Sequence, residues 1–303
     1  AAPFQSTSRQ PVGDKAVPDL HHLLKPFKPD WEALCDNILR KGTPSRVHFI
    51  ELFQDREIQQ AICDRFRLLD GLDPEAPDFP WRREIAVNRF SGFDYVRVGV
   101  DGMNMELFRE SVDDTAALGR NGGRTYQDEH CGPIMSWEDF ERFRWPDPDA
   151  PEATRRLEWY QENLPDDMCI VGSGGFAHIA EMLTWLMGYE TLCYALFDQP
   201  DLVQAISDKL SDLYSRSLAR MVEFDRVKLI WASDDMGFKT GLLISPDDTR
   251  HYILEPHRRL SEESHAAGRP YLLHSCGNLH DIMSDLIETV RIDAKHSFED
   301  TIE

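Results

Sequence analysis

The sequence has no uninterrupted apolar run of about 18 residues, the length that marks a membrane-spanning helix, and it is poor in positive charge. Lysine and arginine number 33 against 54 aspartates and glutamates, so the net charge is −21. Nucleic acids and anionic membranes bind cationic surfaces. We therefore expect neither as a partner and look for a small-molecule substrate.

The six cysteines lack the spacing of a disulfide framework; they lie at positions 35, 63, 131, 169, 193 and 276. Cysteines scattered in this way through a long chain are typical of reduced thiols. The first ten residues also lack the apolar core of a secretory signal. Together these features predict a cytoplasmic protein.

Apolar residues make up 41% of the 303 residues, enough for a complete core. Residues 1–29 are polar and contain proline, which predicts an N-terminal arm. Regular patterns begin at about residue 30, and we expect one domain over 30–303, because α/β barrels typically run to about 250 residues.

Short apolar segments alternate with longer amphipathic ones, which predicts a parallel sheet joined by right-handed crossovers. Strands are expected at 46–53, 94–100, 169–174, 227–233, 270–274 and 292–296, with a hairpin insertion at 120–136. Six such units fit either a doubly wound sheet or most of a (β/α)8 TIM barrel. A closed barrel needs about two more units, which we expect beyond Glu303.

In a barrel, chemistry lies where the strands end, and each predicted strand here ends in polar or flexible residues. We interpret four of these residues as catalytic candidates: Glu51, Asp234, Asp235 and His296. Four others are candidates for substrate binding: Asp101, Asn104, Ser173 and Phe176. An unpaired carboxylate within an apolar strand is costly, so Glu51 is expected to have a cation, a metal or a proton beside it.

Some of these residues also have structural interpretations. The glycines around Ser173 fit a tight turn as well as a phosphate-binding loop. Asp234 or Asp235 could cap the following loop, and His296 could simply form a hydrogen bond across the mouth of the barrel.

His274 and Cys276 lie two residues apart at the end of the predicted strand 270–274. Alternate side chains of a strand share one face at a spacing of roughly 6.5–7 Å. An imidazole and a thiolate so placed can bind one Zn²⁺, although two ligands do not hold a metal. The alternative is a buried thiol beside a hydrogen-bonded histidine.

The segments Leu273-His-Ser-Cys-Gly-Asn278, Asp293-Ala-Lys-His-Ser-Phe-Glu-Asp300 and 232–246 resemble the uroporphyrinogen decarboxylase superfamily. The similarity extends from about residue 30 to the end of the sequence. It is closest to the branch that contains the zinc- and corrinoid-dependent methyltransferases. The resemblance implies a single (β/α)8 barrel.

The methyltransferase branch implies zinc bound by His274, Cys276 and a later cysteine, which would lie beyond Glu303. Glu51, Asp234 or Glu299 could also complete the ligand set. The implied reaction moves a methyl group between a methyl thiol or methoxylated small molecule and a corrinoid on a partner protein. A barrel of this kind could also form a homodimer.

The superfamily also implies a second activity, the removal of tetrapyrrole carboxylates by a lyase. That activity uses an N-terminal motif of the Arg-Gln-Ala-Gly-Arg type, and the corresponding residues 47–53 contain no arginine. Tyr95 falls where the family has its catalytic aspartate, with Asp94 one residue earlier. A third possibility is a non-catalytic barrel that binds a corrinoid or a partner protein.

Overall fold

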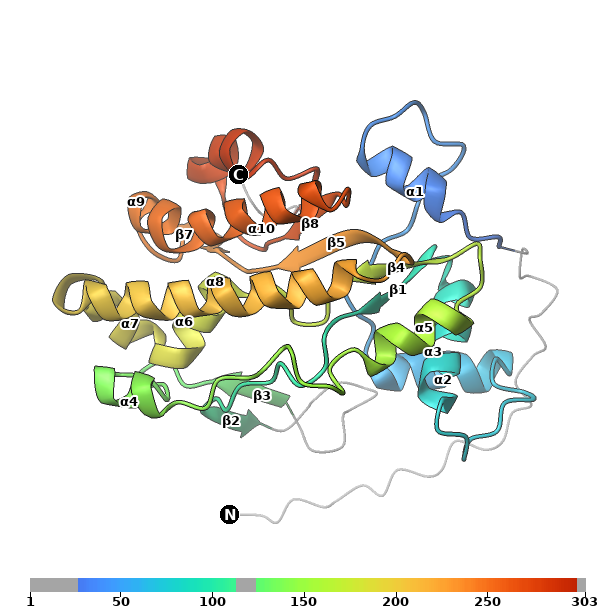
Figure 1. Ribbon diagram of the computed structural model, residues 1–303, viewed down its shortest axis with the longest axis horizontal. Helices are drawn as coiled ribbons and strands as arrows, with labels where there is room; N and C mark the ends of the chain where they lie inside the picture. Colours follow the sequence, from blue (N-terminus) through green and yellow to red (C-terminus); the bar gives the residue numbers. More distant parts are fainter. Residues whose placement is uncertain (1–26, 113–123, 299–303) are drawn as a thin grey trace, which may run out of the picture.

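The computed structural model describes residues 27–112 and 124–298. Its centre is a five-stranded parallel sheet in the order β1-β4-β5-β8-β9 (Figure 1). The strands are β1 (Tyr95–Val98), β4 (Cys169–Gly172), β5 (Val227–Ser233), β8 (Tyr271–His274) and β9 (Ala294–His296). Each lies within or at a segment predicted to be a strand, because short β-rich apolar runs bounded by turns are a strong local signal.

The sheet has two different faces, set by the alternation of side chains along each strand. One face packs against the helices through residues such as Val96, Ile170, Ile230 and Leu273. We call the other the inner face; its apolar residues belong to a separate cluster, comprising Leu34, Ile38, Phe93, Tyr95, Cys169, Val171, Leu229, Trp231 and Leu272.

The helix layer is dominated by α8 (Pro200–Val222) and α10 (Glu255–Ala266), which lie side by side along the sheet (Figure 1). Proline at the first turn of α8 begins the helix without losing a backbone bond. Its buried stripe includes Leu202, Ile206, Leu210 and Leu213, the spacing expected of one helix face.

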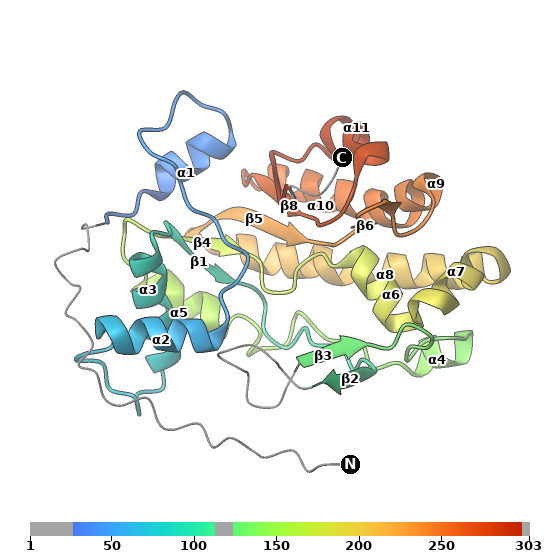
Figure 2. The same ribbon diagram turned by 180° about the vertical axis from the view of Figure 1, so that it is seen from behind.

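Of the remaining helices, three precede β1 and the others lie in connections between strands; Figure 2 shows them from behind. The N-terminal helices are α1 (Trp31–Ile38), α2 (Arg56–Phe66), α3 (Phe79–Ser91), α4 (Trp137–Arg142) and α5 (Arg155–Asn163). The later ones are α6 (Ile179–Met187), α7 (Tyr189–Asp198), α9 (Pro246–Asp248), η2 (Thr249–Leu254), η3 (His280–Ile282), α11 (Met283–Asp285) and η4 (Leu286–Val290). None of the helices in the described part of the chain is both long and apolar enough to cross a bilayer.

Two small antiparallel pairs project from the sheet. They are β2 (Arg109–Val112) with β3 (Arg124–Gln127), and β6 (Gly237–Phe238) with β7 (Gly241–Leu242). The predicted hairpin at 120–136 is therefore misplaced: β3 lies in that range, but its partner β2 precedes it. Part of the predicted hairpin, residues 120–123, lies outside the described residues.

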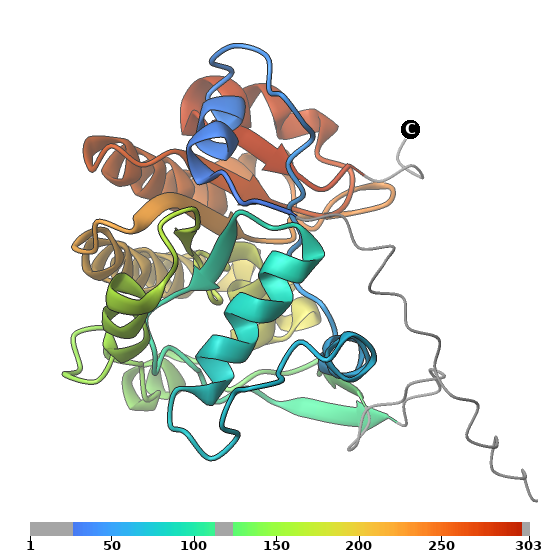
Figure 3. The same ribbon diagram turned by 90° about the vertical axis from the view of Figure 1, so that its right-hand side faces the viewer.

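The predicted strand at 46–53 is wrong, because this segment forms no strand in the structure. It runs beside β1 (Figure 3) and is joined to it through a side chain, since the amide of Glu51 donates to the Tyr95 hydroxyl over 3.0 Å. A strand requires a backbone ladder. The alternation that suggested one is still visible, because Ile50 and Leu52 pack on the inner-face cluster.

The described sheet has five parallel strands rather than six, and it does not close into a barrel within the described residues. A mixed α/β chain with a parallel sheet and crossover helices is consistent with a TIM-barrel-like fold. The full (β/α)8 count stays a prediction. Most of the predicted arm, residues 1–26, lies outside the described residues.

Candidate active site

The carboxyl ends of β8 and β9 bring two histidines together. The strands are parallel neighbours, and their register places His274 opposite His296. Because both residues end their strands, their side chains lie at the edge of the sheet where parallel-sheet enzymes carry their sites. The two Nδ1 atoms are 2.7 Å apart.

Asp235, His274 and Cys276 form one cluster, which we call the triad. One ligand atom from each lies within 4.8 Å of the others. The His274 Nε2 atom is 3.3 Å from the Asp235 carboxylate and 3.5 Å from the Cys276 sulfur. The structure thus adds Asp235 to the predicted His-x-Cys pair as a third potential metal ligand. A further cysteine ligand beyond Glu303 stays a prediction, and Glu299 lies outside the described residues.

The loop after β8 is held in place by a close backbone approach. Gly277 has a φ of +83°, and a Cβ there would meet the Gly237 carbonyl oxygen at 2.1 Å. The amide of Asn278 donates to the carbonyl of Phe238 over 2.8 Å. Only glycine satisfies both the left-handed backbone and the lack of space, so β6 fixes the turn that carries Cys276.

Asp235 is held in its ionised form. Partial burial opposes ionisation, but hydrogen bonds from His274 and from the Cys276 amide outweigh it and lower the pKa of Asp235. The amide of Cys276 lies 2.7 Å from Asp235 Oδ1. An anionic oxygen therefore faces the imidazole and the thiol.

His296 orients the imidazole of His274. Desolvation, together with the neighbouring His274, lowers the pKa of His296, so its ring is neutral at neutral pH and its Nδ1 can accept a proton. Nε2 of His274 donates to the Asp235 carboxylate, 3.3 Å away. A metal ion bound at Nε2 would take the place of that proton, and His274 would then carry its proton on Nδ1 and donate it to His296. A second hydrogen bond that fixes the tautomer in this way is the usual companion of a metal-binding histidine.

Asp234 has a different role from Asp235. It is fully buried, and its two oxygens accept hydrogen bonds from the amides of Ala180 and Glu181 over 2.9 and 3.0 Å. His257 Nε2 lies 2.9 Å from the same carboxylate. Asp234 thus stabilises the first turn of α6 in the helix layer, because a negative charge is favourable at the amino end of a helix.

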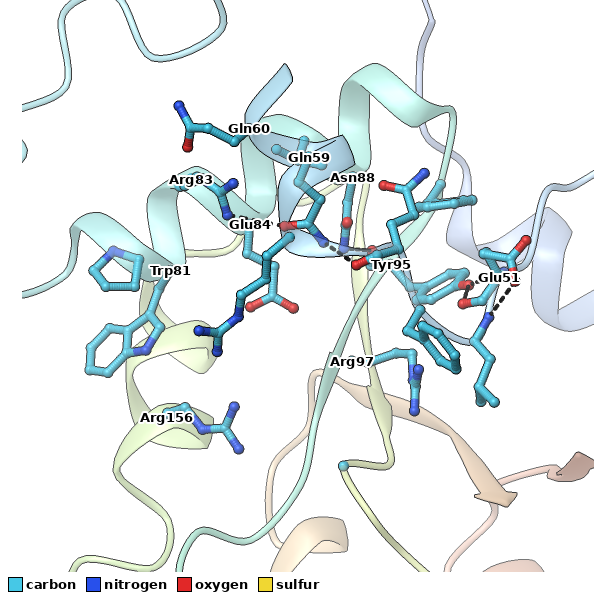
Figure 4. A pocket seen from close by; sticks show the side chains of 18 of the residues that line it. Glu51, Gln59, Gln60, Trp81, Arg83, Glu84, Asn88, Tyr95, Arg97 and Arg156 are labelled. Atoms are coloured by element: carbon cyan, nitrogen blue, oxygen red, sulfur yellow. Dashed lines mark hydrogen bonds between the residues drawn. The ribbon is translucent and has the colours of Figure 1, made fainter. Parts of the chain in front are cut away.

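Glu51 is exposed and is not part of an apolar strand. The expectation that it is a buried carboxylate is therefore wrong, because its segment has no ladder partner to cover it. It does line a cavity of about 990 Å³ between the inner face and helices α2 and α3 (Figure 4). Its catalytic role stays a prediction.

Four arginines line the same cavity: Arg56 from α2, Arg83 from α3, Arg97 from β1 and Arg156 from α5. Figure 4 labels the last three. Sequence reasoning missed them because arginines in short strands and amphipathic helices are usually solvated. One signal was available for Arg97. It alternates with Phe93 and Tyr95, which places a cation on an otherwise apolar face.

The four predicted substrate-binding residues are not gathered in one place. Asp101 accepts from Arg156 Nε over 2.6 Å, and Ser173 accepts from Arg97 over 3.0 Å, so both touch arginines of the cavity. Asn104 is exposed. Phe176 is buried in the helix layer, edge-on to Tyr214 with ring centroids 5.7 Å apart. Substrate binding by these residues stays a prediction.

Asp94, which precedes β1, is fully buried at the amino end of the sheet. It pairs with Arg46, lies 2.8 Å from His48 Nδ1 and accepts from the Asp30 amide over 2.6 Å. These bonds tie two N-terminal segments to the sheet at the end opposite to the triad.

The family model described as Uroporphyrinogen decarboxylase (URO-D) matches residues 130–302, more than half of the chain. The matched span contains the triad and His296. The cavity arginines Arg83 and Arg97 lie before it. No curated protein matches the chain.

Proposed function

Because this chain belongs to the uroporphyrinogen decarboxylase family, we propose that it is a zinc-dependent methyltransferase acting with a corrinoid protein. The proposed substrate is a methyl thiol or a methoxylated small molecule. The observation that carries the proposal is the triad, since Asp235, His274 and Cys276 place an oxygen, a nitrogen and a sulfur within 4.8 Å of one another.

The donor set fits zinc. Zinc binds sulfur at about 2.3 Å and nitrogen or oxygen at about 2.0–2.2 Å, in tetrahedral geometry. Ligand atoms at tetrahedral angles are then roughly 3.3–3.6 Å apart. The distances from His274 Nε2, 3.3 Å to Asp235 and 3.5 Å to Cys276, agree with this spacing.

Three protein ligands are the number that catalytic zinc sites use, the fourth position being taken by water or substrate. When bound, zinc would supply Lewis acidity toward a thiol sulfur or an ether oxygen. The protein residues supply the rest. Asp235 provides a negative charge, His296 keeps His274 in the tautomer with a free Nε2, and Gly277 fixes the position of Cys276.

The first test is the zinc content of the purified protein, wild type against Cys276→Ser. We expect about one zinc per chain, lost in the variant. Cys193→Ser is the matched control, because Cys193 is a half-buried cysteine of α7 outside the triad, and it should retain the metal. Absence of zinc from the wild type would refute the proposal and favour the carboxy-lyase activity.

The second test is methyl transfer itself. Free methylcobalamin and a simple alkanethiol replace the unidentified partner and substrate, and loss of the methyl–cobalt absorption is followed. The zinc-loaded wild type should demethylate the corrinoid faster than Cys276→Ser. Equal rates for the two proteins would contradict a role of the triad in the transfer.

A further inference from the structure

Arg97 pairs with no carboxylate in the part of the chain that the structure describes. It is half-buried on β1, and its Nε and a terminal nitrogen donate to the Ser173 hydroxyl over 3.3 and 3.0 Å. Its guanidinium carbon lies 5.1 Å from the centre of the Trp231 ring. Among the described residues, no carboxylate lies within ion-pairing distance of Arg97.

The surroundings of Arg97 leave its charge uncompensated. The charge of Glu84 acts on Arg97, but the Glu84 carboxyl accepts from the Tyr160 hydroxyl over 2.6 Å, and desolvation raises its pKa. Arg83 donates to the neutral amide of Gln59 over 3.0 Å. Arg156, in contrast, pairs with the carboxylate of Asp101.

The cavity is lined by four arginines and three glutamates (Glu51, Glu57 and Glu84), an excess of cationic side chains that is unexpected in a protein whose net charge is −21. Guanidinium groups held away from carboxylates lose hydration without gaining a counter-charge, which costs free energy unless an anion binds. The planar fork of arginine also matches an oxyanion better than any other cationic side chain. The cavity, about 990 Å³, has the size of a small-molecule site.

We propose that this cavity binds the oxyanion group (carboxylate, sulfonate or phosphate) of a small-molecule substrate, with Arg97 as its anchor and Arg83 and Arg156 beside it. The inference deepens the proposed function, because it makes the methyl-bearing substrate an anion. Binding of the oxyanion itself does not require zinc.

The position of Arg97 also orients the substrate. Trp231 separates Arg97 from His296, the indole and imidazole centroids being 5.1 Å apart, and His296 contacts His274 of the triad. All these side chains lie on the inner face. An oxyanion held at Arg97 would therefore leave the other end of the molecule free to extend along this face toward the triad.

Calorimetric titration tests the anchor with three probes, namely succinate, ethanesulfonate and inorganic phosphate. At least one should bind the wild type, and the tightest identifies the oxyanion. Arg97→Gln should weaken that binding roughly 10- to 100-fold, the value of a hydrogen bond to a charged group. Arg250→Gln is the matched control, since Arg250 pairs with Asp247 and Asp285 on the surface, and it should bind as the wild type does.

Two outcomes would overturn the inference: no probe binds the wild type, or Arg97→Gln binds as tightly as the wild type. If Arg97→Gln does not fold, Arg97→Lys decides, because lysine keeps the charge and loses the fork. Undiminished binding by Arg97→Lys then counts against the anchor.

The same titration on zinc-free Cys276→Ser separates this inference from the proposed function. If oxyanion binding persists in Cys276→Ser while the zinc-loaded wild type shows no methyl transfer, the anchor stands and the methyltransferase is refuted. If the wild type binds zinc and transfers methyl groups while the Arg97 substitutions leave oxyanion binding unchanged, the methyltransferase stands and the anchor is refuted.

Discussion

Asp234 and Asp235 are adjacent in the sequence, yet their carboxylates belong to different parts of the molecule. Asp234 is buried in the helix layer and bonds α6 and His257, whereas Asp235 faces His274 and the Cys276 amide. Neighbouring residues at a strand end point to opposite sides. The sequence alone cannot tell which aspartate faces the site, because a shift of one residue exchanges the two.

We expect these two aspartates to separate stability from metal binding. Asp234→Asn should lower the free energy of unfolding by roughly 3 kcal/mol or more, because it removes the charge from a buried network. Asp235→Asn should change stability little and remove zinc. Urea unfolding and metal analysis of both variants check this, and a stable, zinc-free Asp234→Asn would contradict it.

His296 should act through His274 rather than by touching the substrate. His296→Phe keeps a ring beside Trp231 but cannot accept the hydrogen bond from His274, so zinc affinity should fall by about 10- to 100-fold. His251→Gln, in η2, is the control and should bind zinc normally. Competition with a chelating dye measures both affinities, and an unchanged value for His296→Phe would rule out the orienting role.

At the scale of elements, local sequence patterns predict strands well but not their partners. Residues 227–233 form β5 as predicted, because the run is apolar and bounded by turns. Residues 46–53 have a similar pattern without a ladder, and Val47 and Phe53 remain 75% and 71% exposed. Strand pairing is decided by distant residues that no local pattern contains.

The candidate active site is limited in the same way, because a local pattern does not identify which residues are neighbours in space. His274, Cys276, Asp235 and His296 were selected from the sequence because polar residues at strand ends are informative in parallel sheets. Their proximity depends on the registers of β5 with β8 and of β8 with β9, which the sequence does not show. His257 was missed because a histidine in a polar helix carries no signal of burial, although it is fully buried against Asp234.

The helical segment from Pro246 to Ala266 is divided into α9, η2 and α10, and proline explains the division. Pro256 has no N–H to donate to the Tyr252 carbonyl four residues earlier, and the backbone widens into the π-helix η2 immediately before it. Ser207 of α8 supplies the missing donor, with its hydroxyl 2.6 Å from the Tyr252 oxygen.

Ser207→Ala should therefore lower the free energy of unfolding more than the same substitution of an ordinary buried serine does. The change leaves the Tyr252 carbonyl without this donor, and an unsatisfied buried group costs about 1–3 kcal/mol. Ser217→Ala on the same helix is the control, since its hydroxyl bonds a carbonyl of its own helix, that of Leu213. Urea unfolding measures both variants. Equal losses of unfolding free energy would show that Ser207 does not replace the N–H that Pro256 lacks.

At the scale of the whole molecule, charge is distributed unevenly. The chain carries a large negative excess, while the cavity beside the inner face is lined by four arginines, Arg56, Arg83, Arg97 and Arg156. Glu84 lies among these arginines, yet desolvation raises its pKa more than the Tyr160 hydroxyl and the nearby arginines lower it. Folding therefore favours the protonated form of Glu84.

This raised pKa predicts how stability depends on pH. Below about pH 4.5, the ordinary value for a glutamate, Glu84 is protonated in both the folded and the unfolded chain. As the pH rises through the higher folded pKa, the unfolded chain releases its proton first, so the contribution of Glu84 to stability is lost. Glu84→Gln, which still accepts from Tyr160, should thus be more stable than the wild type at neutral pH and similar to it near pH 4.

Glu255→Gln is a control, because Glu255 is expected to have the opposite effect on how stability depends on pH. A hydrogen bond from Arg258 lowers the pKa of Glu255, so this carboxylate stabilises the fold above its unfolded pKa. Because the pair is largely exposed, its removal should cost little. Urea unfolding from pH 4 to pH 8 measures all three proteins. A Glu84→Gln variant that loses stability on the way to neutral pH as the wild type does would mean that Glu84 is not the group responsible, and that the cavity arginines already hold it ionised.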